Sequence, residues 1–274
     1  MPVATNASPR LLLCVLLLGF GSLCRAGTDE SNPATLPQQS DRTTFIFAAD
    51  AARFEGDFGT DRDVTYDILT SRFRWLSSRL EWRLTVPFLR IDSGVVIVGG
   101  VPVPGPGGDG GTEVGLGDVL AGGEVWALKG TARRPWVGIL GEVKLPTADE
   151  EKGLGTGETD FRAGTRIIQN IGQTSLLFDA SYAVMGDPDN FDFENIVRIG
   201  AGVAQPIGTR HQLFSYVENR THPIPGRDDR LILMIGDSVR FGERRRIRFS
   251  ATALAGLSDT AADWGLVFSL GRQF

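Results

Sequence analysis

The sequence predicts an all-β protein, and specifically a transmembrane antiparallel up-and-down β-barrel of about twelve strands. From residue 43 onward the chain divides into segments of roughly ten to fifteen residues, many of them alternating between apolar and polar side chains, separated by Gly, Pro, Asp and Asn. The connections are alternately short and long, and the last segment alternates up to the final residue, Phe274. Short turns on one side and long loops on the other are typical of outer-membrane barrels, whose termini lie in the periplasm.

The first 26 residues have the pattern of a secretory signal peptide. Arg10 precedes the apolar run LLLCVLLLGFGSLC, and Ala26 stands at the expected cleavage position. The run is short for a membrane-spanning helix, which needs ~20 apolar residues. Lipoprotein processing at Cys14 or Cys24 is the alternative, but each follows a Leu, where lipoprotein signals carry a small residue. The expected organisation is a signal peptide over 1–26, a flexible periplasmic tail over 27–42 and the barrel over 43–274.

The cysteine content and the net charge of the mature chain limit the kinds of partner that we expect. Removal of residues 1–26 takes away both cysteines, so the mature chain has no disulfide. It also removes two arginines and no acid, which leaves 26 basic and 33 acidic residues and a formal net charge of −7. This balance argues against a nucleic-acid partner. We expect a protein of the Gram-negative outer membrane, with membrane lipid, the barrel-assembly machinery and a small-molecule solute as partners.

The connections between the expected strands alternate in length. The connections after the second, fourth, sixth, eighth and tenth strands are tight turns, such as IGQ and IGT, whereas most of the other connections are longer and polar. A soluble sandwich has no reason to alternate its loop lengths in this way. The expected strands lie near 43–54, 61–75, 79–91, 116–129, 135–146, 158–170, 173–186, 194–206, 210–221, 229–241, 245–257 and 262–274.

The two faces of the strands agree with a barrel, although not everywhere. Strands 173–186 and 245–257 alternate well, whereas 61–75, 210–221 and 229–241 alternate poorly, and the first of these needs a bulge before Trp75. Amphipathic rings prefer the membrane interface. Four tryptophans near the short turns are therefore expected to form one aromatic girdle: Trp75, Trp82, Trp126 and Trp136.

The terminal phenylalanine fits the same architecture. A closed barrel pairs its last strand with its first, which places the carboxyl end at the periplasmic rim. Outer-membrane barrels resemble this chain in ending on an aromatic residue that the assembly machinery reads. We therefore expect Phe274 to be the barrel-assembly signal.

Two stretches carry a family resemblance, GLGDVLAGGEVWAL (115–128) and PWVGILGEVKLPTADEEKGLGTGETDF (135–161). Together they resemble the meta-pathway phenol-degradation family of outer-membrane transporter-like proteins, over about residues 115–165. The resemblance implies a porin-like barrel for small organic molecules, and it does not identify the substrate. The motif positions are Gly115, Gly117, Asp118, Lys144, Leu145, Pro146, Thr147, Gly155, Gly157 and Asp160.

The motif residues also have a physical interpretation. Gly115 and Gly117 let the chain turn from loop into strand without a side-chain penalty. Pro146 ends the strand before it because it has no N–H to donate to the ladder. The glycines of GLGTG (153–157) permit a loop that is either flexible or folded inward.

Ten charged residues are expected to point into the lumen. As functional groups they would form facing acidic and basic patches that select solutes by charge and size. Alternatively, they pair with one another and fill the barrel without an open path, because twelve strands fall between filled barrels of eight and water-filled barrels of sixteen. We favour a narrow pore. The ten are Asp118, Glu124, Glu142, Lys144, Asp160, Arg162, Arg166, Asp179, Arg198 and Arg248.

The loop at 93–111 is unusually apolar. Its VVIVGGVPV segment has the pattern of a hairpin with a Gly-Gly turn between β-branched runs. We expect this hairpin to project beyond the membrane. In the alternative it folds into the mouth of the barrel, as a constriction or as a landing site for an apolar substrate.

The function expected from these features is the passive uptake of small molecules, such as aromatic or other small organic compounds. No cofactor and no metal are expected. A barrel enzyme of the hydrolase or deacylase type is the alternative from another class. Its base would be His222, since His211 lies by a periplasmic turn, but no Ser stands in a nucleophile elbow. A closed structural or receptor barrel is the third possibility. We expect no enzymatic activity.

Overall fold

The computed structural model of the chain describes residues 43–59, 63–92, 94–99, 101–104, 111–131, 133–188, 192–242 and 246–274. The expected signal peptide and periplasmic tail lie outside these residues and stay predictions. The described residues contain no helix that is long and apolar enough to cross a membrane.

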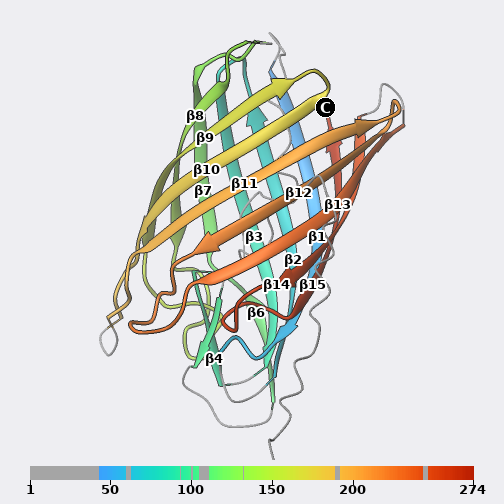
Figure 1. Cartoon of the computed structure of the whole chain (residues 1–274). Coiled ribbons are helices and arrows are strands. Elements are labelled where there is room, and N and C mark those ends of the chain that lie inside the picture. Colours follow the sequence, from blue (N-terminus) through green and yellow to red (C-terminus); the bar gives the residue numbers. More distant parts are fainter. Residues whose placement is uncertain are drawn as a thin grey trace, which may run out of the picture.

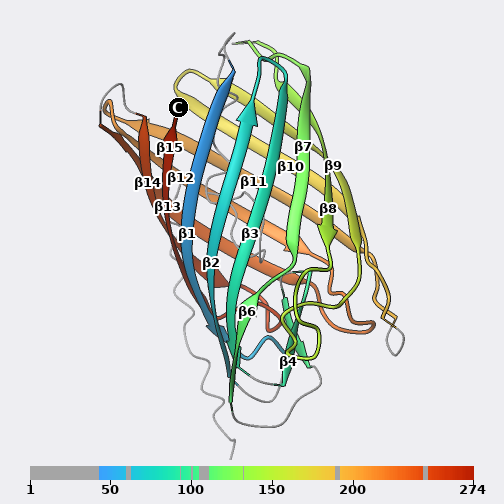
Figure 2. The same cartoon turned by 180° about the vertical axis from the view of Figure 1, so that it is seen from behind.

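Strands make up most of the described chain, and they run at a steep tilt to the long axis of the molecule (Figure 1). Turned by 180°, the molecule shows β1, β2 and β3 side by side (Figure 2). In chain order the strands are β1 (Thr44–Gly56), β2 (Val64–Leu76), β3 (Leu80–Asp92), β4 (Val95–Val98), β5 (Val101–Pro104), β6 (Thr112–Leu116), β7 (Val119–Leu128), β8 (Trp136–Leu145), β9 (Asp160–Ile171), β10 (Thr174–Val184), β11 (Ile196–Ile207), β12 (His211–Arg220), β13 (Arg230–Phe241), β14 (Ile247–Gly256) and β15 (Trp264–Gln273).

The sheet closes on itself. Each strand pairs antiparallel with the next along the wall, and β1 pairs with β15, so that Ala51 lies opposite Phe268. Strands β6 and β7 occupy one position, because both pair with β3. Between them Gly117, Asp118 and Val119 oppose only two residues of β3, which is a β-bulge. The wall therefore has twelve positions, and the predicted fold class is confirmed.

The expected strand boundaries agree with the structure to about three residues at each end, except at the bulged position. There the strand begins at Thr112, earlier than the expected 116, because the chain continues across the bulge. The bulge expected before Trp75 is absent: β2 pairs without interruption with β1 and β3. Tight turns close the end of the barrel at which the chain terminates, and Gly172 and Gly208 adopt positive φ there, which other residues avoid.

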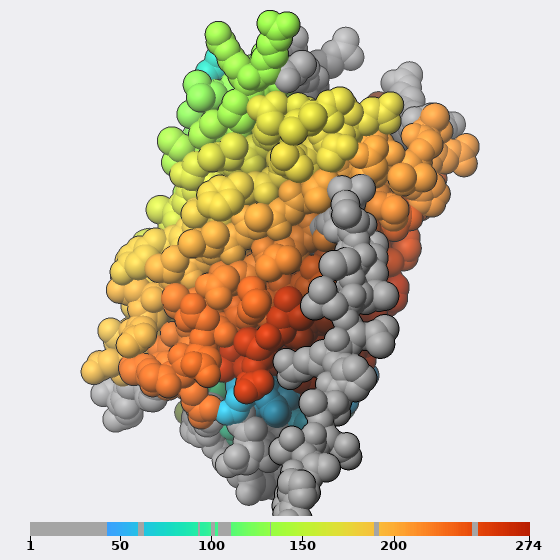
Figure 3. All heavy atoms as spheres, viewed as in Figure 1, coloured from blue at the N-terminus to red at the C-terminus, as the bar shows by residue number. Residues whose placement is uncertain are grey.

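The outward face is an apolar belt. Large apolar side chains are exposed at alternate positions of nearly every wall strand, as a surface that contacts lipid requires. On the face formed by β9 to β13 the side chains make a continuous surface (Figure 3). Members of the belt include Phe47, Leu69, Phe88, Ile139, Phe161, Phe178, Ile199, Val217, Ile235 and Phe268.

The carboxyl end sits at the closing seam. The backbone N–H of Phe274 donates to the carbonyl of Phe45, 2.9 Å away, which extends the β1–β15 pairing to the last residue. The ring itself is 60% exposed and lies 5.1 Å from the Arg272 guanidinium. It is therefore accessible at the rim, and its role in assembly stays a prediction.

The prediction of a tryptophan girdle is only partly confirmed. Trp82 is exposed on the outer face, but Trp126 and Trp136 are both 6% exposed and point into the barrel. Their rings meet edge to face, with centroids 5.8 Å apart. Together with Ile168, Leu177 and Tyr216 they form an aromatic cluster inside the barrel. The prediction failed for these two because nearness to a short turn does not reveal which face a side chain takes.

The opposite end of the interior is apolar. Residues that point inward from β1, β2, β3, β13, β14 and β15 form a cluster that we call the mouth core. The hairpin β4–β5 packs into it, since Val95 and Ile97 belong to the same cluster. The members are Phe54, Phe58, Val64, Tyr66, Ile68, Leu89, Ile91, Val95, Ile97, Leu154, Ile232, Met234, Leu254, Ala261, Ala262 and Val267.

The expectation that the 93–111 hairpin projects outward is therefore wrong for its described part, and the alternative of a hairpin folded into the mouth is correct. Val96, Val98 and Val103 pack on the other side against Ala183, Met185 and Ile196 of the β10–β11 wall region. Apolar surface covers both faces of the hairpin, and burying both faces in the barrel removes more apolar surface from water than projection would.

The loop between β8 and β9 folds inward as well. Leu154 is 2% exposed and belongs to the mouth core, and the carbonyl of Gly153 accepts a hydrogen bond of 3.3 Å from the N–H of Ile97. Gly153 has a φ of 70°, and a Cβ there would collide with the carbonyl of Val95. Of the two behaviours that the glycines of this loop permit, the structure shows the inward fold.

The aromatic cluster depends on a glycine in the β7–β8 turn. A methyl group at Gly130 would overlap the indole ring of Trp136, whereas a methyl group at Gly141 would have no atom within 4 Å. We expect Gly130→Ala to lower the free energy of unfolding by about 1–3 kcal/mol, the cost of overpacking a filled interior. Urea titration in lipid vesicles, followed by tryptophan fluorescence, measures this quantity. Gly141→Ala is the control, and equal destabilisation by both variants would contradict the assignment.

Candidate functional site

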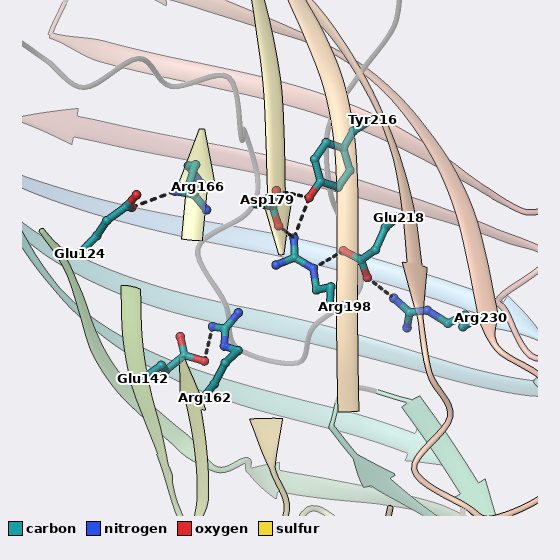
Figure 4. A network of polar contacts seen from close by, with 9 residues as sticks. All are labelled: Glu124, Glu142, Arg162, Arg166, Asp179, Arg198, Tyr216, Glu218 and Arg230. Carbon is teal, nitrogen blue, oxygen red and sulfur yellow. Dashed lines mark hydrogen bonds and ion pairs between the residues drawn. The ribbon is translucent and has the colours of Figure 1, made fainter. Parts of the chain in front are cut away.

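A band of charged side chains crosses the inside of the barrel between the mouth core and the aromatic cluster. Figure 4 shows part of it as paired carboxylates and guanidinium groups on several strands. The buried or nearly buried charged residues are Asp50, Arg72, Arg74, Glu81, Arg83, Asp118, Glu124, Glu142, Lys144, Asp160, Arg162, Arg166, Asp179, Arg198, Glu218, Arg220 and Arg230.

The motif residues of β7, β8 and β9 meet at one point of this band. Lys144 Nζ lies 3.4 Å from Asp118 Oδ2 and 2.9 Å from Asp160 Oδ2, and it donates to Thr156 Oγ1 at 2.8 Å. The bulge after Gly117 turns Asp118 inward. One ammonium between two carboxylates leaves this triad with a net charge of −1.

The remaining motif residues hold the loop over this triad. Thr147 Oγ1 donates to the carbonyl of Gly117 at 3.0 Å and accepts from the N–H of Val119 at 2.9 Å. A Cβ at Gly155 would stand 2.6 Å from Asp118 Oδ2, so only glycine fits beside that carboxylate. The motif therefore describes how the β8–β9 loop is tied into the barrel.

Two further ion pairs on these strands each have no net charge. Arg162 pairs with Glu142 on the neighbouring strand, directly across the β8–β9 register. Arg166 Nη1 donates to Glu124 Oε2 at 3.0 Å, so this pair bridges β9 and β7. On the opposite wall Arg72 pairs with Asp50, while Glu81 accepts from Arg74 and Arg83.

The third group is an arginine row, formed by Arg198, Arg220 and Arg230. The three lie side by side on β11, β12 and β13, since Arg198 pairs with Arg220 and Arg220 with Arg230 in the ladder. Each is 1% exposed. Like charges in directly opposite positions repel, so the row needs counter-charges to be stable.

Those counter-charges come from Asp179 and Glu218. Arg198 lies 3.1 Å from Asp179 Oδ1 and 2.6 Å from Glu218 Oε2, and Arg230 lies 3.1 Å from Glu218 Oε1. Tyr216 donates its hydroxyl to Asp179 and accepts from Arg198 Nη2 at 3.0 Å. Five residues of four strands thus form one network, shown at the centre of Figure 4.

Of the ten charged residues expected in the lumen, the structure places nine in the band. The tenth, Arg248, has the parity of the inner face but is only half-buried, and it lies near the end of β14 that leads to the short β13–β14 turn. Their part in selecting a solute stays a prediction. Sequence reasoning missed the other eight residues of the band, which are Asp50, Arg72, Arg74, Glu81, Arg83, Glu218, Arg220 and Arg230. The last three lie on β12 and β13, whose inner faces also carry Phe214, Tyr216, Ile232 and Met234, so the alternation there was poor.

A small cavity of about 60 Å³ lies between the hairpin and the wall. Its apolar sides are formed by Leu89, Ile97, Leu120, Leu154, Ala183 and Met185, and its charged sides by Asp118, Glu142, Lys144, Asp160, Arg162 and Arg220. The cavity therefore joins the mouth core to the charged band. It is about large enough for a few water molecules.

His222, the candidate base, sits in the β12–β13 loop. Its side chain is buried, and its Nδ1 accepts a hydrogen bond of 3.0 Å from the N–H of Ile224, which is turn geometry. Burial lowers the pKa of His222, and the nearby cations of Arg227, Arg220 and Arg230 lower it further. An acid–histidine pair of a hydrolase has the opposite electrostatic environment. Within the described ranges, no group of His, Cys, Asp and Glu residues could hold a metal ion.

Comparison with known proteins gives a relation in fold alone. No family model matches the chain, and no curated protein is similar in sequence. The crystal structure of the COG4313 outer membrane channel from Pseudomonas putida F1 overlays with a TM-score of 0.62 at 13% identity, over 98% of this chain and 100% of that chain. This chain has the fold of that outer-membrane barrel. The CymD monoaromatic hydrocarbon channel overlays at 0.47, with 11% identity over 88% of this chain and 90% of that chain. The P. putida toluene transporter TodX overlays at 0.45, with 10% identity over 89% and 93%.

Lys144 is the residue on which the acidic side of the band depends. Lys144→Met removes the ammonium between Asp118 and Asp160, so two buried carboxylates face each other without it. We expect the free energy of unfolding to fall by about 3–5 kcal/mol, as when one partner of a buried ion pair is removed. Urea titration in lipid vesicles measures the loss. Adding Asp118→Asn is expected to restore part of it, and a double variant no more stable than the single one would contradict this account.

The lowered pKa of His222 predicts how stability depends on pH. The unfolded chain takes up a proton near the ordinary value of 6.5, whereas the folded chain takes it up only at lower pH. In the interval between the two pKa values the free energy of unfolding should therefore decrease as the pH falls. His222→Asn keeps an acceptor for Ile224 and removes the titration, so the difference in stability between the two proteins should be constant well above pH 6.5 and should change as the pH falls below it. A difference that does not change with pH would exclude this linkage.

Proposed function

We propose that this protein is a channel of the Gram-negative outer membrane that lets small organic solutes pass passively, and that the hairpin β4–β5 and the β8–β9 loop close its mouth. The apolar belt supports the membrane location. The similarity in fold to an outer membrane channel agrees with it.

The observation that carries the proposal is the charged band beneath a mouth filled by separate segments. Buried ion pairs contribute little to stability, and apolar residues of similar volume serve stability as well or better. A barrel that is only a scaffold has no use for the triad around Lys144 and the network around Arg198. A path for polar solutes requires such groups.

The segments in the mouth are built to be separable from the wall. The wall strands satisfy one another by ladder hydrogen bonds around the whole circle. The hairpin forms its own two-stranded sheet and contacts the wall through apolar side chains, and among its described residues Ile97 makes a backbone hydrogen bond to the β8–β9 loop at Gly153. Displacing it would break no ladder hydrogen bond of the wall.

The solute class follows from the lining of the path. Leu89, Ile97 and Met185 offer apolar surface beside the charged groups of the cavity. Small organic molecules that combine an apolar body with a polar group suit this mixed lining better than sugars or inorganic ions, and the family resemblance implies small organic molecules as well. Aromatic compounds would fit this mixed lining.

Two other functions are weaker. The enzyme alternative needs an activated His222, but the structure surrounds this residue with arginines and uses it in a turn. A closed structural barrel would leave the charged band without a role, and it remains the outcome if no solute passes.

Val98 tests whether the hairpin is a gate. Its side chain is fully buried among apolar residues of the hairpin and wall. Val98→Lys places an ammonium there, which neither the apolar cluster nor the nearby guanidinium of Arg220 accommodates, so the hairpin is expected to leave its seat while the wall stays folded. In a planar bilayer, refolded residues 27–274 should show discrete conductance steps. In the variant the open fraction should rise about tenfold or more, the factor for each 1.4 kcal/mol of lost docking.

Val98→Ala is the matched control, since it removes packing without adding charge and should open the channel less. Heat-modifiable migration in gel electrophoresis verifies that each barrel is folded. Silence from the folded wild type and from the folded Val98→Lys variant would reject the channel and leave the closed structural barrel.

A further inference from the structure

We propose that the end of the barrel with the short turns binds the phosphate groups of anionic phospholipids, through basic side chains that follow the turns around the barrel. This inference goes beyond the passage of solutes and rests only on the membrane location in the proposed function.

The apolar belt reaches the ends of the strands at the short turns. Exposed apolar side chains stand on the outward face at the last residues of β9, β11 and β13 and directly after β15. The headgroups of a bilayer begin where its hydrocarbon core ends, so they lie level with these turns. The four side chains are Ile171, Ile207, Phe241 and Phe274.

Exposed basic residues lie at the same level. They come from the β2–β3, β7–β8, β11–β12 and β13–β14 turns and from the end of β15. They are therefore distributed around the barrel and do not form a single patch, which suits a lipid leaflet better than one soluble partner. We call seven of them the basic rim: Arg79, Lys129, Arg133, Arg134, Arg210, Arg246 and Arg272.

The acidic side chains that the structure describes at this end are few and are already in contact with cations. Glu81 is buried inside the barrel against Arg74 and Arg83. Asp237 lies 2.7 Å from Nδ1 of His211. The rim is therefore positive, although the whole chain has a formal net charge of −5.

The mouth has the opposite charge. In its described loops the exposed charged residues are mostly acidic, against the basic residues Lys152 and Arg227. The barrel is thus polarised along its axis, so anionic lipid is attracted to the short turns and repelled from the mouth. Examples of the acidic residues are Asp149, Glu150, Asp192, Glu194, Asp228 and Asp229.

Arginine has the chemistry that a lipid phosphate requires. Its planar guanidinium group donates two parallel N–H groups to phosphate oxygens, and its apolar stem can lie along hydrocarbon while the charge stays among the headgroups. Arg272 has this position, since it follows the exposed Leu270 on the outward face and its guanidinium carbon lies 5.1 Å from the centre of the Phe274 ring. Anionic phospholipid should therefore gather in the leaflet that the short turns face.

Electron spin resonance measures this lipid selectivity. Refolded residues 27–274 are placed in phosphatidylcholine vesicles at low ionic strength, with a trace of spin-labelled phosphatidylglycerol or of spin-labelled phosphatidylcholine with the same acyl chains. The fraction of label that the barrel immobilises gives the relative affinity for the two lipids. We expect a preference of about threefold for phosphatidylglycerol, because the roughly fivefold effect of one basic contact is averaged with lipid around the mouth. NaCl at about 1 M should remove most of it, because the rim is exposed.

Two sets of substitutions remove the rim charges. Arg133→Gln with Arg134→Gln takes two charges from one turn and should lower the preference. Adding Arg210→Gln and Arg272→Gln to this pair should bring the ratio of the two affinities close to one.

Arg53→Gln with Arg90→Gln is the matched control. It also removes two exposed guanidinium groups, but from the outward face at the mouth end, where Asp67 lies between them at 3.7 Å from Arg53 and 3.0 Å from Arg90. This variant should keep the preference of the wild type.

Heat-modifiable migration in gel electrophoresis verifies that each barrel is folded, and if the four-site variant does not fold, the two double variants decide. Equal immobilisation of both lipids by the folded wild type, or an equal loss of preference in the two double variants, would overturn the lipid-binding rim and leave the channel untouched. A protein that folds in detergent but does not enter the vesicles would reject the membrane location itself.

Discussion

Closure of the sheet is the constraint on which the rest of the structure depends. Once β1 pairs with β15, no edge remains, and every second side chain must point into a space that twelve strands neither fill nor leave wide open. The chain fills this space in three different ways. Aromatic side chains occupy the end with the short turns, ion pairs occupy the middle, and apolar wall residues with the inserted hairpin occupy the mouth.

Alternation and loop length were sufficient to predict the barrel, its strand number and most strand boundaries, because period-2 patterning and turn chemistry are local properties of a sequence. The same reasoning gave the inner position of Asp118, Glu142 and Lys144, whose strands alternate plainly. It assumed, however, that the inner face is polar throughout. Where the inner face is apolar, as at Tyr66 and Ile68 of β2, alternation faded and the inside could not be told from the outside.

The parts that escaped prediction depend on contacts between distant segments. The segment with Val95 and Ile97 has the pattern of an ordinary projecting hairpin, because the apolar wall against which it packs is formed by distant segments of the chain. The arginine row likewise exists only through the register of β11, β12 and β13, since Arg198 and Arg230 are separated by more than thirty residues in sequence. A pattern within one strand carries no information about its neighbours' register, which closure and the turns determine together.

In the proposed channel, the placement of apolar and charged groups separates the segment that would open from the groups that would stay in place. The hairpin is retained by burial of apolar surface, an interaction without direction that tolerates small displacements. The arginine row is retained by directed ion pairs that lose most of their strength when a group moves or water enters. A hairpin tip that rests on Arg220 therefore places the easily displaced part of the structure directly above the part whose geometry must stay fixed. In the proposed channel, opening of the mouth would leave this network intact, because Arg198, Glu218 and Asp179 belong to strands of the wall.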